Sequence, residues 1–283
     1  MKKIWDKVVH EGYLIALGDI SAMYALSLMI GLSITWDYLL VVFLMIFSLL
    51  SFNYYKEIDK DMITNPKRAK LTSRRKKILP LIIIFSSVLA LVLVYIYSSI
   101  LTVIFLVCLI IGGSLYTVRL KSLTVNVIGF KSFYVASFYS MLVILMALYY
   151  KISLTSAVFL VLVFYFTRIF INTVFCDVRD IDGDNKNKLK TFAIVLGEKK
   201  SIFYLNCINI LSTAPIVLGV VLNIIPTYSL FILITIIYTA FNLFAYKEDI
   251  VKRMVLFNVL IEGEFIIWMP VLMIGKYVSE LVT

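Results

Sequence analysis

Long apolar runs separated by short polar connections dominate this sequence. A helix needs about 20 mostly apolar residues to cross a hydrocarbon core ~30 Å thick, and nine runs come close to that length. They cover residues 12–32, 37–54, 78–98, 99–118, 127–149, 154–176, 202–222, 227–246 and 254–275. We therefore expect an all-α polytopic membrane protein with about nine transmembrane helices, forming one membrane-embedded domain over residues 1–283.

The composition supports a membrane protein. Apolar residues make up 62% of the chain, charged residues only 16%, and the mean hydropathy is +0.99, values outside the range of soluble domains. The three scattered cysteines predict neither a disulfide framework nor a metal site. A net charge of +10 would favour nucleic acid as a partner of a soluble protein, but no nucleic-acid-binding motif is present.

The distribution of Lys and Arg explains most of this positive charge. Nine spans place the two termini on opposite sides of the membrane, and 23 of the 27 Lys and Arg residues fall on the N-terminal side. Because positive residues are retained in the cytoplasm, we expect the N-terminus and the long polar loops to be cytoplasmic and the C-terminus outside. The first apolar run lacks the small-residue pattern of a cleaved signal peptide.

An acidic cluster follows the sixth apolar run, within residues 176–191. Asp177, Asp180 and Asp184 are spaced i, i+3 and i+7, so a helix that continues past the membrane would place them on one face, with Asp182 pointing elsewhere. Carboxylates so close together repel one another unless they share a cation. The alternative for this stretch is a solvated loop between two helices.

A second acidic cluster follows the second apolar run. Asn53, Glu57 and Asp61 are spaced i, i+4 and i+8, again on one helical face, before Pro66 and several basic residues. Its alternative is a helix whose acids pair with neighbouring lysines. Two acidic faces on the same membrane side, each followed by cations, suit a diphosphate held through Mg²⁺.

These residues resemble the UbiA-type intramembrane prenyltransferase family. The family's first motif, Asn-Asp-x-x-Asp-x-x-x-Asp with a following Pro and Arg, is matched in spacing by Asn53, Glu57, Asp61, Pro66 and Arg68, with departures at Tyr54 and Glu57. Its second motif, Asp-x-x-Asp-x-x-Gly-Asp with a following Lys-Thr and glycine, is matched by Asp177, Asp180, Gly183, Asp184, Lys190, Thr191 and Gly197. A Tyr-x-x-x-x-Lys loop is matched by Tyr116 and Lys121, with Asn126 beyond.

The resemblance implies a helical barrel with a central cavity that opens to the lipid and is capped by the cytoplasmic loops. It implies Mg²⁺-dependent transfer of a polyprenyl group from its diphosphate to a lipid or aromatic acceptor in the membrane. The implied metal ligands are Asn53, Glu57, Asp61, Asp177, Asp180 and Asp184. The implied diphosphate contacts are Arg68, Tyr116, Lys121 and Lys190, and the implied catalytic residues are Asp180, Asp184 and Lys121.

Several alternatives remain open at this point. Because Tyr54 and Glu57 alter the first motif, the chain could be a catalytically silent member that binds lipid or acts as a scaffold. Asp182-Gly183 also occurs in alcohol phosphatidyltransferases, but the Ala-Arg that should follow is absent. A transporter is disfavoured because the charged groups concentrate on one surface. The compact length would suit enzymes that add a geranylgeranyl group to a glyceryl phosphate.

A few polar residues within or near the apolar runs need separate interpretation. His10, the only histidine, lies in the charged tail, where a catalytic base is not expected. Asp19 is either an acceptor-side group or the partner of a buried donor. Lys131 lies close enough to a run's end to extend to the membrane surface. Arg168 must find a buried partner and could support the site. Glu262 and Glu264 are the acids of the last run. Glu262 is the candidate partner for Lys131 or Arg168.

Overall fold

The computed structural model describes residues 2–247 and 254–282, and every regular element in this part of the chain is a helix. This confirms the all-α class. The elements are α1 (Lys2–His10), α2 (Tyr13–Met29), α3 (Trp36–Lys56), α4 (Ile58–Thr64), α5 (Pro66–Arg74), α6 (Leu79–Tyr97), α7 (Ile100–Val118), η1 (Leu120–Val125), α8 (Phe130–Tyr149), α9 (Ser156–Arg179), α10 (Ile181–Lys186), α11 (Phe192–Leu196), α12 (Glu198–Leu211), α13 (Ala214–Val221), η2 (Thr227–Leu233), α14 (Ile234–Lys247) and α15 (Met254–Val282).

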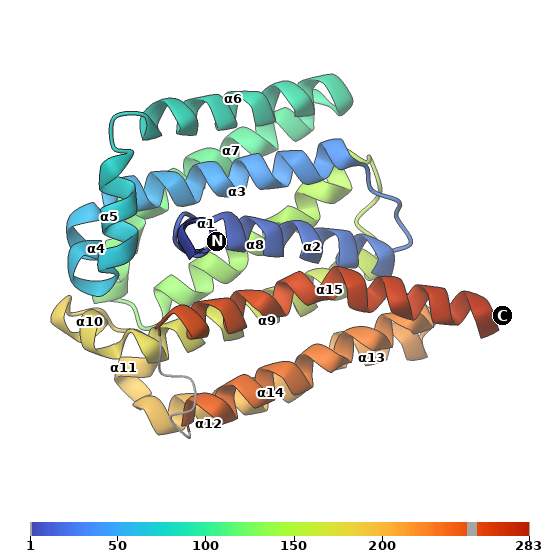
Figure 1. Cartoon of the computed structure of the whole chain (residues 1–283). Helices are drawn as coiled ribbons and strands as arrows, with labels where there is room; N and C mark the ends of the chain where they lie inside the picture. The colour runs from blue at the N-terminus through green and yellow to red at the C-terminus, as the bar shows by residue number, and fades with distance from the viewer. Residues whose placement is uncertain (1, 248–253, 283) are drawn as a thin grey trace.

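Within the described residues, eight helical stretches are long and apolar enough to cross a membrane. The first expected span, α2, is a shorter apolar helix of 17 residues, and at 1.5 Å per residue it extends about 25 Å. The expectation of about nine apolar helices therefore holds. Figure 1 shows the long helices lying alongside one another, with the short helices α4, α5, α10 and α11 gathered at one end.

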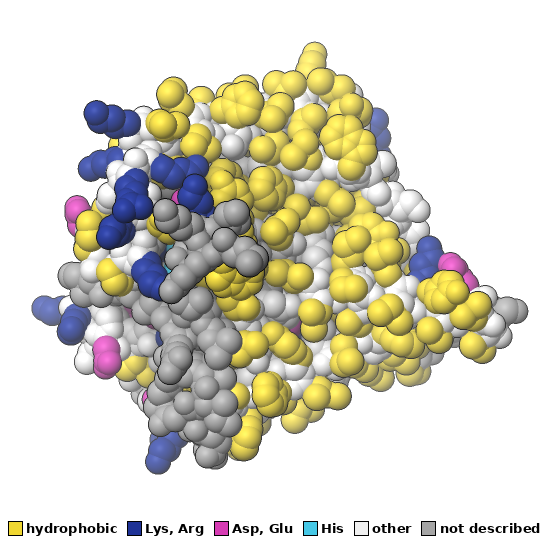
Figure 2. Space-filling view, viewed as in Figure 1, with side chains coloured by type: hydrophobic (Ala, Val, Ile, Leu, Met, Phe, Trp, Pro, Cys, Tyr) yellow, Lys and Arg dark blue, Asp and Glu magenta, His cyan; other side chains and the backbone are white. Residues whose placement is uncertain are grey.

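The membrane-spanning helices divide into inner and outer ones. Buried apolar residues concentrate on α2, α3, α8 and α9, which form the centre of the main core. On α6, by contrast, Leu81 and Phe85 are each 68% exposed, which suits a surface facing lipid. Figure 2 shows exposed apolar side chains over most of the visible face and Lys and Arg side chains at the end that carries α4 and α5.

The seventh and the last spans differ in detail from their expected form. The seventh run is not one continuous helix, because α12 ends at Leu211 and α13 starts at Ala214, with Pro215 in its first turn. Proline is tolerated there because the first turn of a helix leaves its N–H groups unpaired. The last helix, α15, continues to Val282 and is therefore longer than the apolar run that predicted it.

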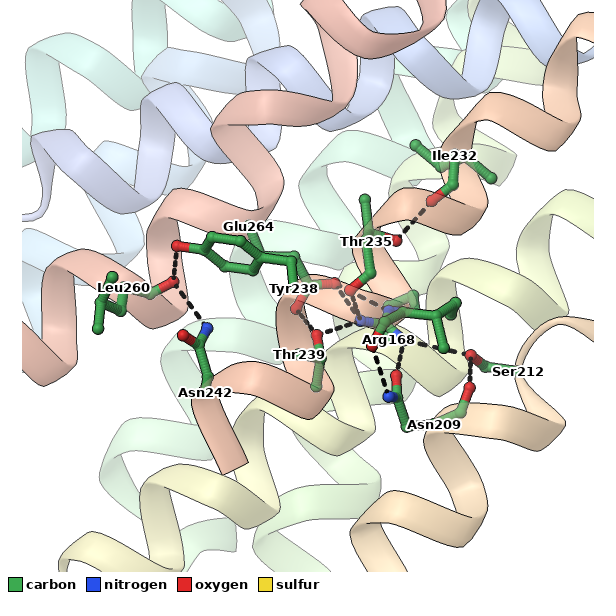
Figure 3. Close-up of polar contacts among 11 residues, drawn as sticks. Arg168, Asn209, Ser212, Ile232, Thr235, Tyr238, Thr239, Asn242, Leu260 and Glu264 are labelled. Carbon is green, nitrogen blue, oxygen red and sulfur yellow. Dashed lines mark hydrogen bonds and ion pairs between the residues drawn. The ribbon is translucent and has the colours of Figure 1, made fainter. Parts of the chain in front are cut away.

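A buried polar network joins α9 to the C-terminal helices. Arg168 is completely buried, and its Nε donates to Glu264 Oε1 at 2.8 Å, while Nη1 donates to Asn209 Oδ1 at 2.5 Å. Its Nη2 donates to Thr239 Oγ1, which in turn donates to Glu264 Oε2 at 2.7 Å. Figure 3 shows these side chains converging on the guanidinium. Arg168 thus has the buried partner expected of it, and that partner is Glu264; the side chain of Glu262 lies outside the described ones.

Candidate active site

The first acidic face lies where helix α3 gives way to the short helix α4. Helix α3 ends at Lys56 and α4 begins at Ile58, so Glu57 stands between them with φ −105° and ψ 15°. The backbone spacing survives the break, because Glu57 N–H donates to Asn53 O at 3.0 Å and Asp61 N–H donates to Glu57 O at 2.8 Å. Asn53, Glu57 and Asp61 therefore stay on one side, as the i, i+4 and i+8 spacing predicts.

The second acidic face is built in the same way. Helix α9 ends at Arg179, Asp180 stands at the break, and α10 begins at Ile181. Asp180 N–H donates to Cys176 O at 3.1 Å, and Asp184 N–H donates to Asp180 O at 2.9 Å. Each acidic face thus begins where a membrane-spanning helix ends and turns into a short helix at the polar end of the molecule (Figure 1).

The two faces border a common cavity of about 430 Å³, which we call the charged cavity. It lies among α3, α4, α5, α7, η1, α8, α9 and α10. The polar and charged side chains that line it are those of Asn53, Glu57, Lys60, Asp61, Arg68, Thr117, Lys121, Ser122, Lys131, Arg179, Asp180, Asp184 and Asn187. Residues far apart in the sequence therefore bring acids and cations to one space at the polar end of the molecule.

Each acid of the first face is paired with a cation from a different element. Lys121 Nζ donates to both carboxylate oxygens of Glu57, at 2.6 and 2.8 Å. Arg68 donates to Asp61 through Nε at 2.7 Å and through Nη2 at 2.5 Å. The Tyr54 ring lies 4.6 Å below the Arg68 guanidinium, a cation–π contact that holds Arg68 beside Asp61. The departure at Tyr54 therefore gives this chain a support for Arg68.

The second face is more unevenly paired. Asp180 forms a bidentate pair with Arg179, with both contacts at 2.7 Å. Burial alone would raise the pKa of Asp180, but the hydrogen-bonded Arg179 outweighs it, so the pKa lies below its ordinary value. The Asp177 carboxylate forms an ion pair with Lys131 at 2.6 Å and accepts a hydrogen bond from Ser132 Oγ at 2.8 Å.

Asp184 is the exception on this face. Its Oδ2, like Asp177 Oδ1, has no hydrogen-bond partner among the described residues, but its distance to the Lys131 ammonium is 3.8 Å, against 2.6 Å for Asp177. Burial raises the pKa of Asp184 to about 6, and the charges of Asp177 and Asp180 act in the same direction. The charged form of Asp184 thus has only a distant cation beside it, in a cavity that other carboxylates also line.

A glycine positions the helix that carries Lys131. Gly129 precedes α8 with φ 67°, and a Cβ at this position would lie 2.1 Å from the ring of Phe192, so only glycine fits. Its N–H donates to Lys190 O at 2.9 Å, and Lys190 N–H donates to Thr124 O at 2.8 Å. These bonds fix the loop after α10 against the start of α8.

Two further cavities adjoin the charged one. The apolar cavity, about 220 Å³, is lined mainly by residues of α3, α7 and α8, including Leu49, Tyr134 and Phe138. The third cavity, about 250 Å³, is lined by His10, Leu14, Asn65 and Ile261, together with Arg68, Arg179 and Asp180, which also line the charged cavity. Asn53 lines all three cavities, so it marks the point where they meet.

The sequence matches the UbiA prenyltransferase family over residues 14–262. The chain belongs to this family. Membership confirms the resemblance inferred from the two acidic motifs, and with it the expectation of an integral membrane prenyltransferase. No curated protein sequence is significantly similar to the chain.

Solved structures share the fold at low sequence identity. A UbiA homolog from Aeropyrum pernix K1 has a TM-score of 0.66 and 13% identity, covering 95% of this chain and 98% of that one. A UbiA homolog from Archaeoglobus fulgidus bound to DMAPP and Mg²⁺ has a TM-score of 0.62 and 12% identity, covering 94% and 99%. A structure of digeranylgeranylglyceryl phosphate synthase has a TM-score of 0.58 and 16% identity, covering 98% of each chain.

Most of the residues that the family resemblance singled out come together, but not all of them do. Asn53, Glu57, Asp61, Arg68, Lys121, Asp180 and Asp184 line the charged cavity. Tyr116 lines the apolar cavity and stacks on Tyr134 with 4.7 Å between ring centroids. Asp177 lies behind the cavity wall and is completely buried. Lys190 is exposed and does not line the charged cavity; its backbone makes the bonds described above.

Two important cations of the site were not predicted. Lys131, expected to extend to the membrane surface, instead pairs with Asp177, because α8 packs along α9 and brings the two side chains together. Arg179 was not distinguished from the other loop cations, although it neighbours Asp180. Asp19 accepts a hydrogen bond from Tyr165 at 2.8 Å, which agrees with its interpretation as the partner of a buried donor.

The described residues fit a Mg²⁺ ion that is bound together with a diphosphate. No three His, Cys, Asp or Glu side chains in the described ranges converge closely enough to hold a metal by themselves. However, Mg²⁺ commonly takes only one or two carboxylates and completes its shell with water and phosphate oxygens. Asp180 and Asp184 line the charged cavity and are the carboxylates of the second face that such an ion could reach.

Proposed function

We propose that this chain transfers a polyprenyl group from its diphosphate to an acceptor within the membrane. The observation that carries this proposal is the meeting of three cavities of different chemistry at Asn53. A prenyl transfer needs a polar space for the diphosphate, an apolar space for the isoprenoid chain and a place for the acceptor. An A. fulgidus homolog was solved bound to DMAPP and Mg²⁺, a prenyl diphosphate and a metal ion of the kind that the charged cavity would hold.

The charged cavity supplies cations that would bind and orient the diphosphate. Lys121 and Arg68 are held by Glu57 and Asp61 at the cavity wall, where their remaining N–H groups can donate to phosphate oxygens. Asp180 and Asp184 would hold Mg²⁺, which when bound would neutralise charge on the leaving group. Burial lowers the pKa of Lys121, and the adjacent Glu57 carboxylate opposes this shift and favours the charged form.

The apolar cavity would receive the isoprenoid chain. Lys121, Lys131 and Thr117 line both this cavity and the charged one, so the allylic C–O bond would lie at their boundary. Tyr116 and Tyr134 form a stacked pair on the wall just inside that boundary. Their ring faces can lie against an allylic cation as it forms, and the surrounding apolar side chains exclude water that would otherwise capture it.

We propose that the acceptor binds in the third cavity and carries an anionic group. Arg68 and Arg179 line this cavity together with His10. Asp180 is the one carboxylate among the described lining residues, and it is already paired with Arg179. Leu14, Ile15 and Ile261 supply an apolar side. A glyceryl phosphate lipid and an aromatic carboxylate both combine an anionic group with an apolar body, so both belong to this class.

The end of the molecule that carries the charged cavity also supports a proposal for its orientation in the membrane. The charged cavity opens among α4, α5 and α10, whose surroundings carry the Lys and Arg side chains seen in Figure 2. We propose that this end and the N-terminus face the cytoplasm, because basic residues are retained there. The C-terminus, at the opposite end in Figure 1, would lie outside.

Product formation by purified protein tests the proposal. Protein in detergent with Mg²⁺ would be given geranyl or geranylgeranyl diphosphate with a geranylgeranylglyceryl phosphate or 4-hydroxybenzoate, and products identified by mass spectrometry. Asp184→Asn should lower the rate about 100-fold or more, the scale seen when a preorganised electrostatic group is removed. Asp182→Asn is the matched control, because it makes the same chemical change two residues away. Asp182 is exposed and does not line the cavity.

A catalytically silent member is the second candidate. The departures at Tyr54 and Glu57 motivated it, but both residues hold cations of the site here, which favours an active enzyme. Binding of a non-hydrolysable prenyl thiodiphosphate separates the two candidates. A tight, Mg²⁺-dependent complex with no product from any acceptor would contradict transfer to the acceptors tested, whereas binding unaffected by Mg²⁺ would support the silent member.

A further inference from the structure

Lys131 and Ser132, consecutive residues in the first turn of α8, contact the two oxygens of Asp177, the first through an ion pair and the second through a hydrogen bond. Lys131 Nζ lies 2.6 Å from Oδ1, and Ser132 Oγ donates to Oδ2 at 2.8 Å. Asp177 is completely buried, and it does not line the charged cavity. A metal ion could reach this carboxylate only by displacing two donors from a place that water does not reach. Removing a partner from a buried charge is strongly unfavourable.

Asp184 has the opposite surroundings on the same face. It lines the charged cavity, and its Oδ2 lies 3.8 Å from Lys131 Nζ, against 2.6 Å for Asp177 Oδ1. Asp180 lines the cavity beside it, and both of its oxygens accept from Arg179. Its side chain is 32% exposed, so an ion in the cavity can reach it, whereas Asp177 is completely buried. These two carboxylates are enough for a Mg²⁺ ion that also takes diphosphate oxygens and water. The second motif can therefore bind its metal without Asp177.

Lys131 is also placed to act on the diphosphate. Its side chain is 19% exposed and lines both the charged and the apolar cavity, so its ammonium lies where the diphosphate would meet the isoprenoid chain. An ammonium has three N–H donors. The ammonium forms ion pairs with Asp177 at 2.6 Å and Asp184 at 3.8 Å, and it keeps N–H donors for an oxygen of the leaving group.

We propose that Lys131 is a built-in cation of the second acidic motif: it holds Asp177 in place of a metal ion and leaves Asp180 and Asp184 as the metal-binding carboxylates. This inference rests on the proposed function and deepens it, because it names a residue that would bind the diphosphate leaving group. It also revises the ligand set implied by the family resemblance, in which Asp177 binds metal.

Binding of Mn²⁺ to the full-length protein in detergent tests the proposal without any turnover. Mn²⁺ shares the oxygen ligands of Mg²⁺, and its free concentration can be measured by electron paramagnetic resonance. Asp184→Asn should weaken binding at least about tenfold. The double variant Asp177→Asn/Lys131→Met removes the pair as a unit and should bind within about threefold of the natural protein. Lys131→Met alone frees the Asp177 carboxylate and should tighten binding about tenfold.

Matched controls and opposite outcomes make the test decisive. Asp182→Asn and Lys186→Met change charge on exposed positions of α10 and should shift the Mn²⁺ dissociation constant less than twofold. If the double variant bound Mn²⁺ as weakly as Asp184→Asn, Asp177 would be a metal ligand and the proposal would be wrong. Unchanged affinity in Lys131→Met would equally overturn it, and if that variant did not fold, the double variant would decide alone.

Metal binding and product formation can fail independently, so the test of Lys131 is distinct from the test of the proposed function. If the natural protein bound Mn²⁺ as expected but formed no prenylated product, the transfer proposal would fail while the role of Lys131 stood. If the natural protein did not bind Mn²⁺ at all, the metal dependence and this inference would both fall.

Discussion

Arg168 and Lys131 are two cations that lie in apolar helices, on α9 and α8, and the structure gives them different surroundings. Arg168 is fully buried, and its guanidinium is bonded to Glu264, Asn209, Ser212 and Thr239. Lys131 has one close partner, Asp177, a second acid 3.8 Å away, and an open cavity beside it. Arg168 is surrounded by protein donors and acceptors, whereas Lys131 lies at the wall of a space that a ligand can fill.

This difference separates a structural cation from a functional one. A buried polar network that is fully satisfied rigidifies the helices that it joins, and the Arg168 network links α9 to α12, α14 and α15 (Figure 3). An incompletely paired group in a cavity, such as Asp184, keeps capacity for a ligand. The free energy of unfolding in mixed micelles, measured with Mg²⁺ or with EDTA, tests this division.

The largest effect is expected from Arg168→Met. The substitution leaves Glu264 buried beside Thr239 with no cation, and breaking a buried pair by removing one partner costs about 3–5 kcal/mol. Mg²⁺ should not restore the lost stability, because Arg168 does not line the charged cavity. Equal free energies of unfolding for Arg168→Met and the natural protein would contradict the role given to this network.

A second variant distinguishes the lost ion pair from lost packing. Arg168→Met/Glu264→Gln removes both charges and keeps side chains of similar volume, so it should recover a large part of the loss. If the double variant were no more stable than the single one, the cost would come from packing around α9 and not from the unpaired carboxylate.

A smaller effect, and one that depends on metal, is expected from Lys131→Met. In EDTA the variant should lose about 2–3 kcal/mol, less than a fully enclosed pair, because Ser132 still donates to Asp177 and the site adjoins a cavity. With Mg²⁺ much of this loss should be recovered, since the ion can neutralise the freed carboxylate. Identical losses with and without Mg²⁺ would show that Lys131 is as purely structural as Arg168.

The sequence alone could predict the acidic faces but not these two pairings. Asp180 and Asp184 follow each other by a fixed helical offset, and the backbone bond between them survives the break in the helix, so local spacing was a sufficient guide. The Lys131–Asp177 pair depends on how α8 packs against α9, and the Arg168–Glu264 pair joins residues 96 positions apart. A lone cation in an apolar run indicates that a partner exists, but it does not identify the partner.

The loop after α10 is a second place where the sequence could not predict which group of a residue contacts the site. Lys190 stands in the expected position of the motif, yet its side chain is exposed and only its backbone contributes, through bonds with Gly129 and Thr124. A motif fixes the order of residues along the chain. Whether a side chain or a peptide group faces the site depends on the path of the loop, and here the positive φ of Gly129 helps to set that path.

The smallest effects compare two serines, one from each pair. Ser132→Ala removes the hydrogen bond to Asp177 Oδ2 from a completely buried position and should cost about 1.5–3 kcal/mol, the range for a hydrogen bond to a charged group. Ser212→Ala removes a 3.2 Å contact to Arg168, which keeps its other partners, and a hydrogen bond to Asn209 O, and should cost only about 1 kcal/mol.

The ratio of these two serine effects is informative because both substitutions remove the same hydroxyl group. Asp177 has few donors, so it depends on each of them, whereas Arg168 has several acceptors that share its charge. A larger loss for Ser212→Ala than for Ser132→Ala would reverse the comparison: it would mean that the Arg168 network is the more fragile of the two and that Lys131 alone satisfies Asp177. Ser132 would then contribute mainly to packing at the start of α8, and the stability of the buried Asp177 would depend on Lys131.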